Sequence, residues 1–158
     1  MELTNRRLMW HGMFLFLLGL LTGLAEPRFA NMRMGLAAHL EGLMNGIFLL
    51  VLGAVWSHVS LSPRVKTSAY WIVLYGAYAN WLTTTVAAFF GTGALSPITA
   101  HGHTGRPWQE TLVTLGFVTV GLTTVVASVL LLWGLRSGGL HSDPTTPLKP
   151  RKMQAKAG

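Results

Sequence analysis

Residues 34–57 read MGLAAHLEGLMNGIFLLVLGAVWS, an apolar run that contains one histidine, one glutamate and one asparagine. Crossing about 30 Å of hydrocarbon takes about 20 helical residues, so this run is long enough to span a bilayer. Three other segments have the same reach, and the predicted helices are Leu8–Ala25, Met34–Ser57, Thr67–Phe90 and Glu110–Leu135. Backbone groups in lipid must bond internally, and four segments are too few to close a barrel. The sequence therefore predicts an all-α integral membrane protein, a four-transmembrane-helix bundle.

The composition agrees with a lipid solvent. Of the 158 residues, 51% are hydrophobic and 11% are charged, whereas a soluble domain carries about 25% charged residues. The absence of cysteine excludes disulfides and thiolate chemistry. The net charge of +7 lies mostly beside apolar segments and near the C-terminus. We assign it to topology and contact with the lipid bilayer, and expect no nucleic-acid partner.

Positive charge also predicts the orientation, because cytoplasmic loops of membrane proteins carry an excess of lysine and arginine. Three such residues fall on one side of the predicted spans: Arg28, Arg33 and Arg106. The others fall on the opposite side: Arg6, Arg7, Arg64, Lys66, Arg136, Lys149, Arg151, Lys152 and Lys156. Both termini are therefore predicted to be cytoplasmic.

The chain divides into a transmembrane domain, residues 1–136, and a basic cytoplasmic tail, residues 137–158, whose polar composition predicts disorder. The first helix could instead be a cleaved signal, because Arg6-Arg7 and the small residues Gly23 and Ala25 fit one. Its apolar core is longer than that of a signal, and its removal would leave an odd number of helices. We expect it to be retained.

Polar side chains inside the predicted spans are the first candidates for function, because placing them in lipid is costly. Glu41 is the only acid well inside a span, and His39 precedes it by two residues. Asn45 and Asn80 are the only amides in the spans, and antiparallel helices bring them to a similar depth. Thr84 lies on the same small, polar face of the third helix as Asn80.

The second helix has two distinct faces. At 100° per residue, one face carries Gly35, His39, Gly42, Gly46 and Gly53. Glu41 and Asn45 lie on nearly the opposite side. A Gly42/Gly46 pair is typical of a close helix contact, with His39 bonded across it. The alternative is that these glycines leave room for a flat cofactor whose metal is bound by His39.

The number of protein ligands that a metal centre requires limits which kind of centre this sequence could bind. A bare zinc or iron site takes three or four protein ligands, which one His and one Glu on different faces do not supply. A haem needs a single axial ligand. The other histidines are assigned no chemistry: His11 and His58 are expected to contact lipid or snorkel, and His101 and His103 to be exposed in the third connection.

Four runs of the sequence resemble hydroxylaminobenzene mutase: His11-Gly12, AHLEGLMNG (38–46), LYGAYANW (74–81) and LWGLR (132–136). The likeness covers about residues 6–136. It implies a membrane isomerase that converts a small aromatic hydroxylamine, hydroxylaminobenzene, to 2-aminophenol by intramolecular hydroxyl transfer. That reaction belongs to bacterial nitroarene degradation, which implies a multi-pass protein of the bacterial inner membrane.

A more distant resemblance is to styrene oxide isomerase, in which a histidine is followed six residues later by Asn-Gly, as His39 is by Asn45-Gly46. It implies haem b bound through His39, with ferric iron as a Lewis acid, in a homo-oligomer for which the resemblance favours a trimer. A gapless match places Gly76 and Thr84 where that family has acidic and tyrosine residues.

The expected catalytic residues are Asn45, Asn80, Glu41 and Thr84. The expected cofactor-binding residues are His39, Gly42 and Gly46, with His39 as the metal ligand. Because the histidine and the Glu41/Asn45 pair face different ways, we expect the cofactor at an interface between protomers. Two alternatives stay open: an aryl epoxide isomerase, and a non-catalytic haem-binding or transport subunit of the membrane.

Overall fold

The computed structural model describes residues 2–136, which form four long helices. They are α1 (Glu2–Ala25), α2 (Met32–Val55), α3 (Pro63–Phe90) and α5 (Pro107–Arg136). The short helix α4 (Pro97–Ala100) lies in the last connection, and 3-10 turns follow α1 (Glu26–Arg28) and α2 (Trp56–His58). No strand occurs in the described part of the chain, so the all-helical prediction is confirmed. The predicted tail, residues 137–158, lies outside the described residues.

Local sequence sets the helix ends. Asn31 caps α2, because its side chain accepts a hydrogen bond from the backbone N–H of Met34 at 3.1 Å. Pro63 and Pro107 open α3 and α5, where a missing N–H costs nothing. Gly91 ends α3 with a φ of 67°, a conformation that glycine adopts without strain. The helices α3 and α5 therefore begin earlier than predicted, since their first turns are polar.

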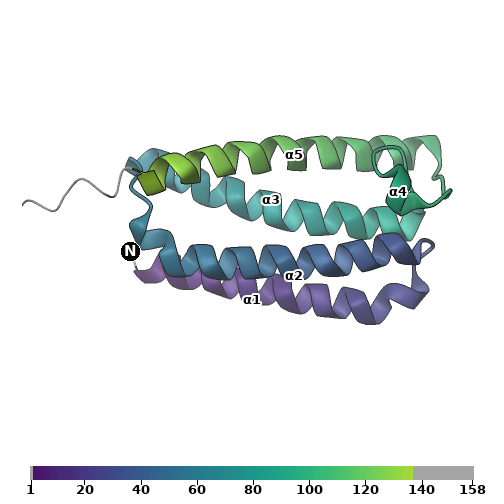
Figure 1. The fold of residues 1–158 in the computed structure, drawn as a ribbon, viewed down its shortest axis with the longest axis horizontal. Coiled ribbons are helices and arrows are strands. Elements are labelled where there is room, and N and C mark those ends of the chain that lie inside the picture. The colour runs from purple at the N-terminus through teal and green to yellow at the C-terminus, as the bar shows by residue number, and fades with distance from the viewer. Residues whose placement is uncertain (1, 137–158) are drawn as a thin grey trace, which may run out of the picture.

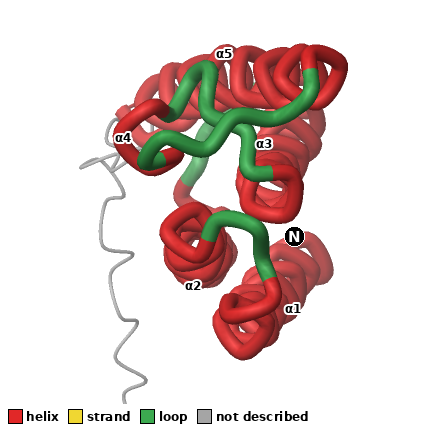
Figure 2. Tube along the Cα trace, turned by 90° about the vertical axis from the view of Figure 1, so that its right-hand side faces the viewer, coloured by secondary structure: helices red, strands yellow, loops and turns green. Residues whose placement is uncertain are grey.

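The four long helices run side by side (Figure 1). Viewed from the end, α1 and α2 form one pair and α3 and α5 the other (Figure 2). The pairs meet chiefly along α2 and α3, whereas α5 packs mainly on α3. The helix α5 is therefore an edge helix with much of its surface open.

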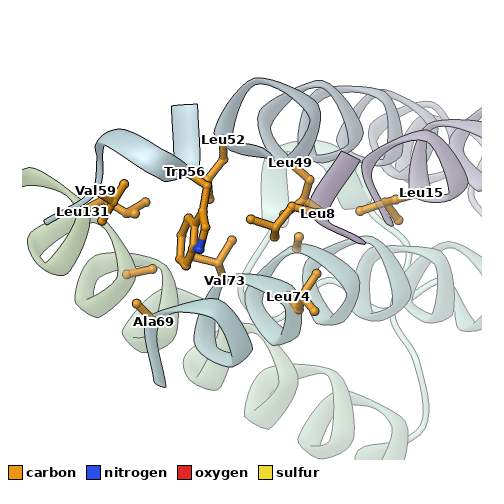
Figure 3. Packing of buried hydrophobic residues seen from close by; sticks show 12 residues of the cluster. Leu8, Leu15, Leu49, Leu52, Trp56, Val59, Ala69, Val73, Leu74 and Leu131 are labelled. Carbon is orange, nitrogen blue, oxygen red and sulfur yellow. The ribbon is translucent and has the colours of Figure 1, made fainter. Parts of the chain in front are cut away.

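A thin hydrophobic core joins the two pairs. Its larger side chains include Leu8, Leu15, Leu49, Trp56 and Leu74, each no more than 5% exposed. Trp56 points from the end of α2 toward Val73 of α3 (Figure 3). Large apolar side chains also cover the outside of the bundle, as Leu24 does at 77% exposure and Leu132 at 70%. Such an outer surface suits lipid rather than water.

Within residues 2–136, three helices are long and apolar enough to cross a membrane: Leu3–Arg28, Met32–His58 and Pro107–Arg136. The helix α3 is as long, but it begins with Arg64 and Lys66 and later carries Asn80 and three consecutive threonines. The structure thus gives an all-helical protein with three candidate spans. A fourth span through α3 stays a prediction.

Candidate functional site

The glycine face of α2 is filled by α1. A Cβ atom added at Gly42 would lie 2.5 Å from the Cα of Gly19, and one at Gly46 would lie 2.7 Å from the backbone nitrogen of Phe16. The two backbones are therefore in direct contact, as glycine pairs allow. This corrects the expectation that Gly42 and Gly46 flank a cofactor, because no planar ring fits between these backbones.

His39 is bonded across this contact. Its Nδ1 lies 2.8 Å from the carbonyl oxygen of Gly19. A carbonyl only accepts, so Nδ1 carries the proton and donates it, which leaves the lone pair on Nε2. Gly23 makes room for the ring, since a Cβ there would lie 2.6 Å from Nδ1. The side chain is half-buried, and Nε2 has no hydrogen-bond partner among residues 2–136.

The opposite face of α2 holds the acid and the amide against α3. Thr84 donates a hydrogen bond from Oγ1 to Oε2 of Glu41 at 2.6 Å. Asn45 donates from Nδ2 to the carbonyl oxygen of Ala77 at 3.3 Å. The prediction that Glu41 and Asn45 face away from His39 is therefore confirmed.

A cavity of about 270 Å³ lies where α2, α3 and α5 meet. It is lined by Asn45, Phe48, Ile72, Val73, Gly76, Ala77, Asn80, Thr124, Ala127 and Ser128. The two amides thus share one cavity. Gly76 is part of its wall, and a Cβ there would stand 3.6 Å from the hydroxyls of Thr123 and Thr124, an ordinary contact distance. The volume suits a single substituted ring better than a drug-sized ligand.

Glu41 and Thr84 do not line this cavity, but they stand one turn away from it. Glu41 precedes Asn45 by four residues on α2, and Thr84 follows Asn80 by four residues on α3. Four helical residues rise about 6 Å. The hydrogen-bonded acid and hydroxyl therefore form a second layer beside the two amides, so all four expected catalytic residues lie along one helix contact.

Two polar contacts between α1 and α3 are not predicted by the sequence pattern. The hydroxyl of Tyr78 lies 3.0 Å from Nδ1 of His11, so this ring, which the sequence predicts to contact lipid or to snorkel, bonds within the bundle. Trp81 donates from Nε1 to the hydroxyl of Thr22 at 3.0 Å. The only signal in the sequence is that His11, Tyr78 and Trp81 belong to the runs that carry the family resemblance.

The third connection is tied to the bundle. The carboxylate of Glu110 accepts hydrogen bonds from the backbone N–H groups of Gly93, Ala94 and Gly105, at distances from 2.7 to 3.2 Å. Asn31 donates to the carbonyl oxygens of Thr99 and Ala100, each at 3.1 Å. The chain between α3 and α5 is therefore held at this end of the bundle.

The side chains available as metal ligands determine which kind of metal centre the described residues could hold. Within residues 2–136, no cluster of three or more His, Asp or Glu side chains is placed to hold a metal ion. His39 does fit a group that needs one axial ligand, because a backbone carbonyl orients the ring and leaves Nε2 to donate its lone pair. The glycine face is closed by α1, so such a group does not fit between these two helices.

Comparison with known proteins bears on the chemistry. The family model for styrene oxide isomerase matches residues 4–136. Hydroxylaminobenzene mutase HabB of Ectopseudomonas oleovorans is 46% identical over 143 residues, 90% of this chain and 87% of that protein. Hydroxylaminobenzene mutase HabA of the same organism is 41% identical over 125 residues, 78% of this chain and 93% of that protein. No solved structure matches the chain.

The described chain combines apolar helices of membrane-spanning length with a small cavity that two amide side chains help to line. Together with these relatives, this arrangement defines an isomerase of the membrane-protein class. The chain belongs to the styrene oxide isomerase family and is related to the hydroxylaminobenzene mutases. Both resemblances seen in the sequence are confirmed. Membership of an isomerase family also sets aside the non-catalytic alternative.

Proposed function

We propose that the protein converts hydroxylaminobenzene to 2-aminophenol by intramolecular hydroxyl transfer. The observation that carries the proposal is the cavity shared by Asn45 and Asn80, with Glu41 and Thr84 in the next layer. The relatives named hydroxylaminobenzene mutase support this substrate. Substrate and product are isomers, so the reaction needs no external oxidant or reductant.

The bonds that break and form in this reaction indicate a role for each of these side chains. The N–O bond breaks, a C–O bond forms at the ortho carbon, the proton of that carbon leaves, and the nitrogen gains a proton. Asn45 and Asn80 offer donors and acceptors that orient the hydroxylamine group. Glu41, which Thr84 holds one turn from the cavity, is the assigned acceptor of the ring proton and the source of the proton for nitrogen, and it would act through a hydrogen-bonded relay rather than by direct contact with the ring.

The apolar walls of the cavity have a separate task. Phe48, Ile72 and Val73 line it beside the amides and limit the access of water. Exclusion of water matters because an electron-poor aryl nitrogen species would react with bulk solvent. An apolar aromatic substrate also partitions into lipid, where this cavity lies among the helices.

Haem b is the proposed cofactor, with Nε2 of His39 as its axial ligand. When bound, its iron would supply a Lewis acid that withdraws electron density from the N–O bond. His39 bonds to α1, whereas the cavity lies on a different side of α2, toward α3. We therefore propose a homo-oligomer, a trimer by resemblance, in which His39 of one protomer faces the cavity of another.

The proposed setting is the bacterial inner membrane, with four spans and both termini in the cytoplasm. The support is the charge distribution and a helix α3 that runs the length of the other three (Figure 1). Reporter fusions after residue 136 and within residues 91–106 should give opposite signals. A periplasmic signal from the C-terminal fusion would contradict the four-span arrangement.

The activity test uses detergent-purified protein without any electron donor. Formation of 2-aminophenol from hydroxylaminobenzene, measured by chromatography, supports the proposal. An aryl epoxide is the second candidate substrate, because the styrene oxide isomerase family model covers the whole bundle. Turnover of styrene oxide without turnover of the hydroxylamine would favour that alternative, and turnover of neither would overturn both.

A further inference from the structure

A second groove, of about 510 Å³, lies at the end of the bundle that carries the N-terminus. The start of α1 contributes Arg7, and the first turns of α3 contribute Lys66, Tyr70 and Trp71. Trp56, at the end of α2, forms part of the wall. The groove shares no residue with the cavity of Asn45 and Asn80, so the reaction does not account for it.

Two positive charges face this groove, and none of the described side chains that line it is negative. The Nζ of Lys66 donates to the carbonyl oxygen of Val59 at 2.6 Å and lies 5.7 Å from the centre of the Trp56 ring. An ammonium has three donors, so two remain after this bond. Arg7 is exposed and has no ion pair or hydrogen bond with the side chains of residues 3–136. None of the described residues that line the groove is acidic.

From this arrangement we propose that the groove binds the phosphate headgroup of an anionic phospholipid. An Arg guanidinium and a held Lys ammonium suit phosphate oxygens, the former as a two-pronged donor. The aromatic rings argue for a lipid rather than a soluble anion: Trp71 is 63% exposed, and Trp and Tyr side chains gather where helices leave the hydrocarbon. Basic grooves between helix ends are typical sites for acidic lipid headgroups.

The test is native mass spectrometry of the purified full chain in mild detergent, titrated with phosphatidylglycerol. The parent should bind one phosphatidylglycerol tightly and phosphatidylcholine weakly. Arg7→Gln and Lys66→Gln should each weaken binding roughly fivefold, from about 1 kcal/mol per basic residue near a lipid surface. Lys66→Arg keeps the charge and should stay near the parent, which separates charge loss from misfolding.

The matched control is Arg64→Gln, because Arg64 is an exposed cation in the same first turn of α3 but does not line the groove. Its affinity should stay within twofold of the parent. If Arg64→Gln weakens binding as much as Lys66→Gln does, or if neither groove variant weakens it, the proposal is overturned. Displacement of phosphatidylglycerol by millimolar inorganic phosphate would assign the groove to a free anion and would overturn the lipid assignment.

Discussion

The contact between Gly42 and Gly19 makes a quantitative prediction about Gly42→Ala. The new methyl carbon would lie 2.5 Å from the Cα of Gly19, whereas carbon atoms pack best at about 3.5–4.0 Å. The nearest obstacle is the backbone of Gly19, which cannot rotate away as a side chain can, so α1 must shift by about 1 Å. The ring of Trp81, whose Cδ1 would lie 3.0 Å from the new methyl carbon, is crowded as well. Overpacking of this kind costs roughly 1–3 kcal/mol. We expect Gly42→Ala to lower the free energy of unfolding by that amount.

The control variant is Gly121→Ala, because Gly121 lies in the long helix α5 and a Cβ there meets nothing within 4 Å. Both variants replace a helical glycine with alanine and share the same gain in helix propensity. The assay is a titration of detergent-purified protein with sodium dodecyl sulfate, followed by circular dichroism. If Gly42→Ala and Gly121→Ala unfold at the same detergent fraction, α1 and α2 are not in backbone contact at Gly19, and the reasoning fails.

Three further predictions concern single side chains. His39→Ala should abolish both the Soret absorbance and the activity of the purified enzyme. Asn45→Ala should keep the Soret band and lose about a hundredfold or more in rate, since an oriented hydrogen bond in a dry site is worth on the order of 2–4 kcal/mol. Equal loss of haem in the two variants would contradict these roles. Thr84→Val removes the 2.6 Å bond to the acid and should destabilise the bundle by roughly 0.6–1.7 kcal/mol in the same detergent titration; an unchanged midpoint would refute this. Glu110→Gln removes the carboxylate that accepts hydrogen bonds from several backbone N–H groups of the third connection. It should therefore speed amide hydrogen exchange across residues 93–105. The control Glu26→Gln should leave that exchange unchanged, because no side-chain hydrogen bond of Glu26 is seen among the described residues.

The helices and the faces of α2 are predictable from the sequence because both are local properties. A span needs only a run of apolar residues, and a face needs only 100° per residue. The helical period alone puts His39 and Asn45 about 120° apart around α2, and the two side chains do bond to different neighbouring helices. The polar first turns of α3 and α5 are not predicted because they do not look apolar, although Pro63 and Pro107 mark their starts.

The partner that packs against a given helix face cannot be predicted in this way, because it depends on residues far away in the chain. The glycine stripe of α2 is compatible with a cofactor or with a helix, and only the fold shows that α1 occupies it. The contact of His11 with Tyr78 joins residues 67 positions apart. The bonds from Glu110 to the third connection depend on backbone groups, which a sequence pattern does not reveal.

The pairing of the helices has a mechanical consequence. The hydrogen bond between His39 and Gly19 lies within the α1–α2 pair, whose backbones are in direct contact. The amide cavity lies on the seam between that pair and the α3–α5 pair. A small change in the crossing angle of the two pairs would widen or narrow the cavity and leave the orientation of the imidazole untouched. The proposed ligation by His39 and the proposed fit of an aromatic ring in the cavity would then be separated by α2, because a shift at the seam leaves the geometry of the His39–Gly19 bond unchanged.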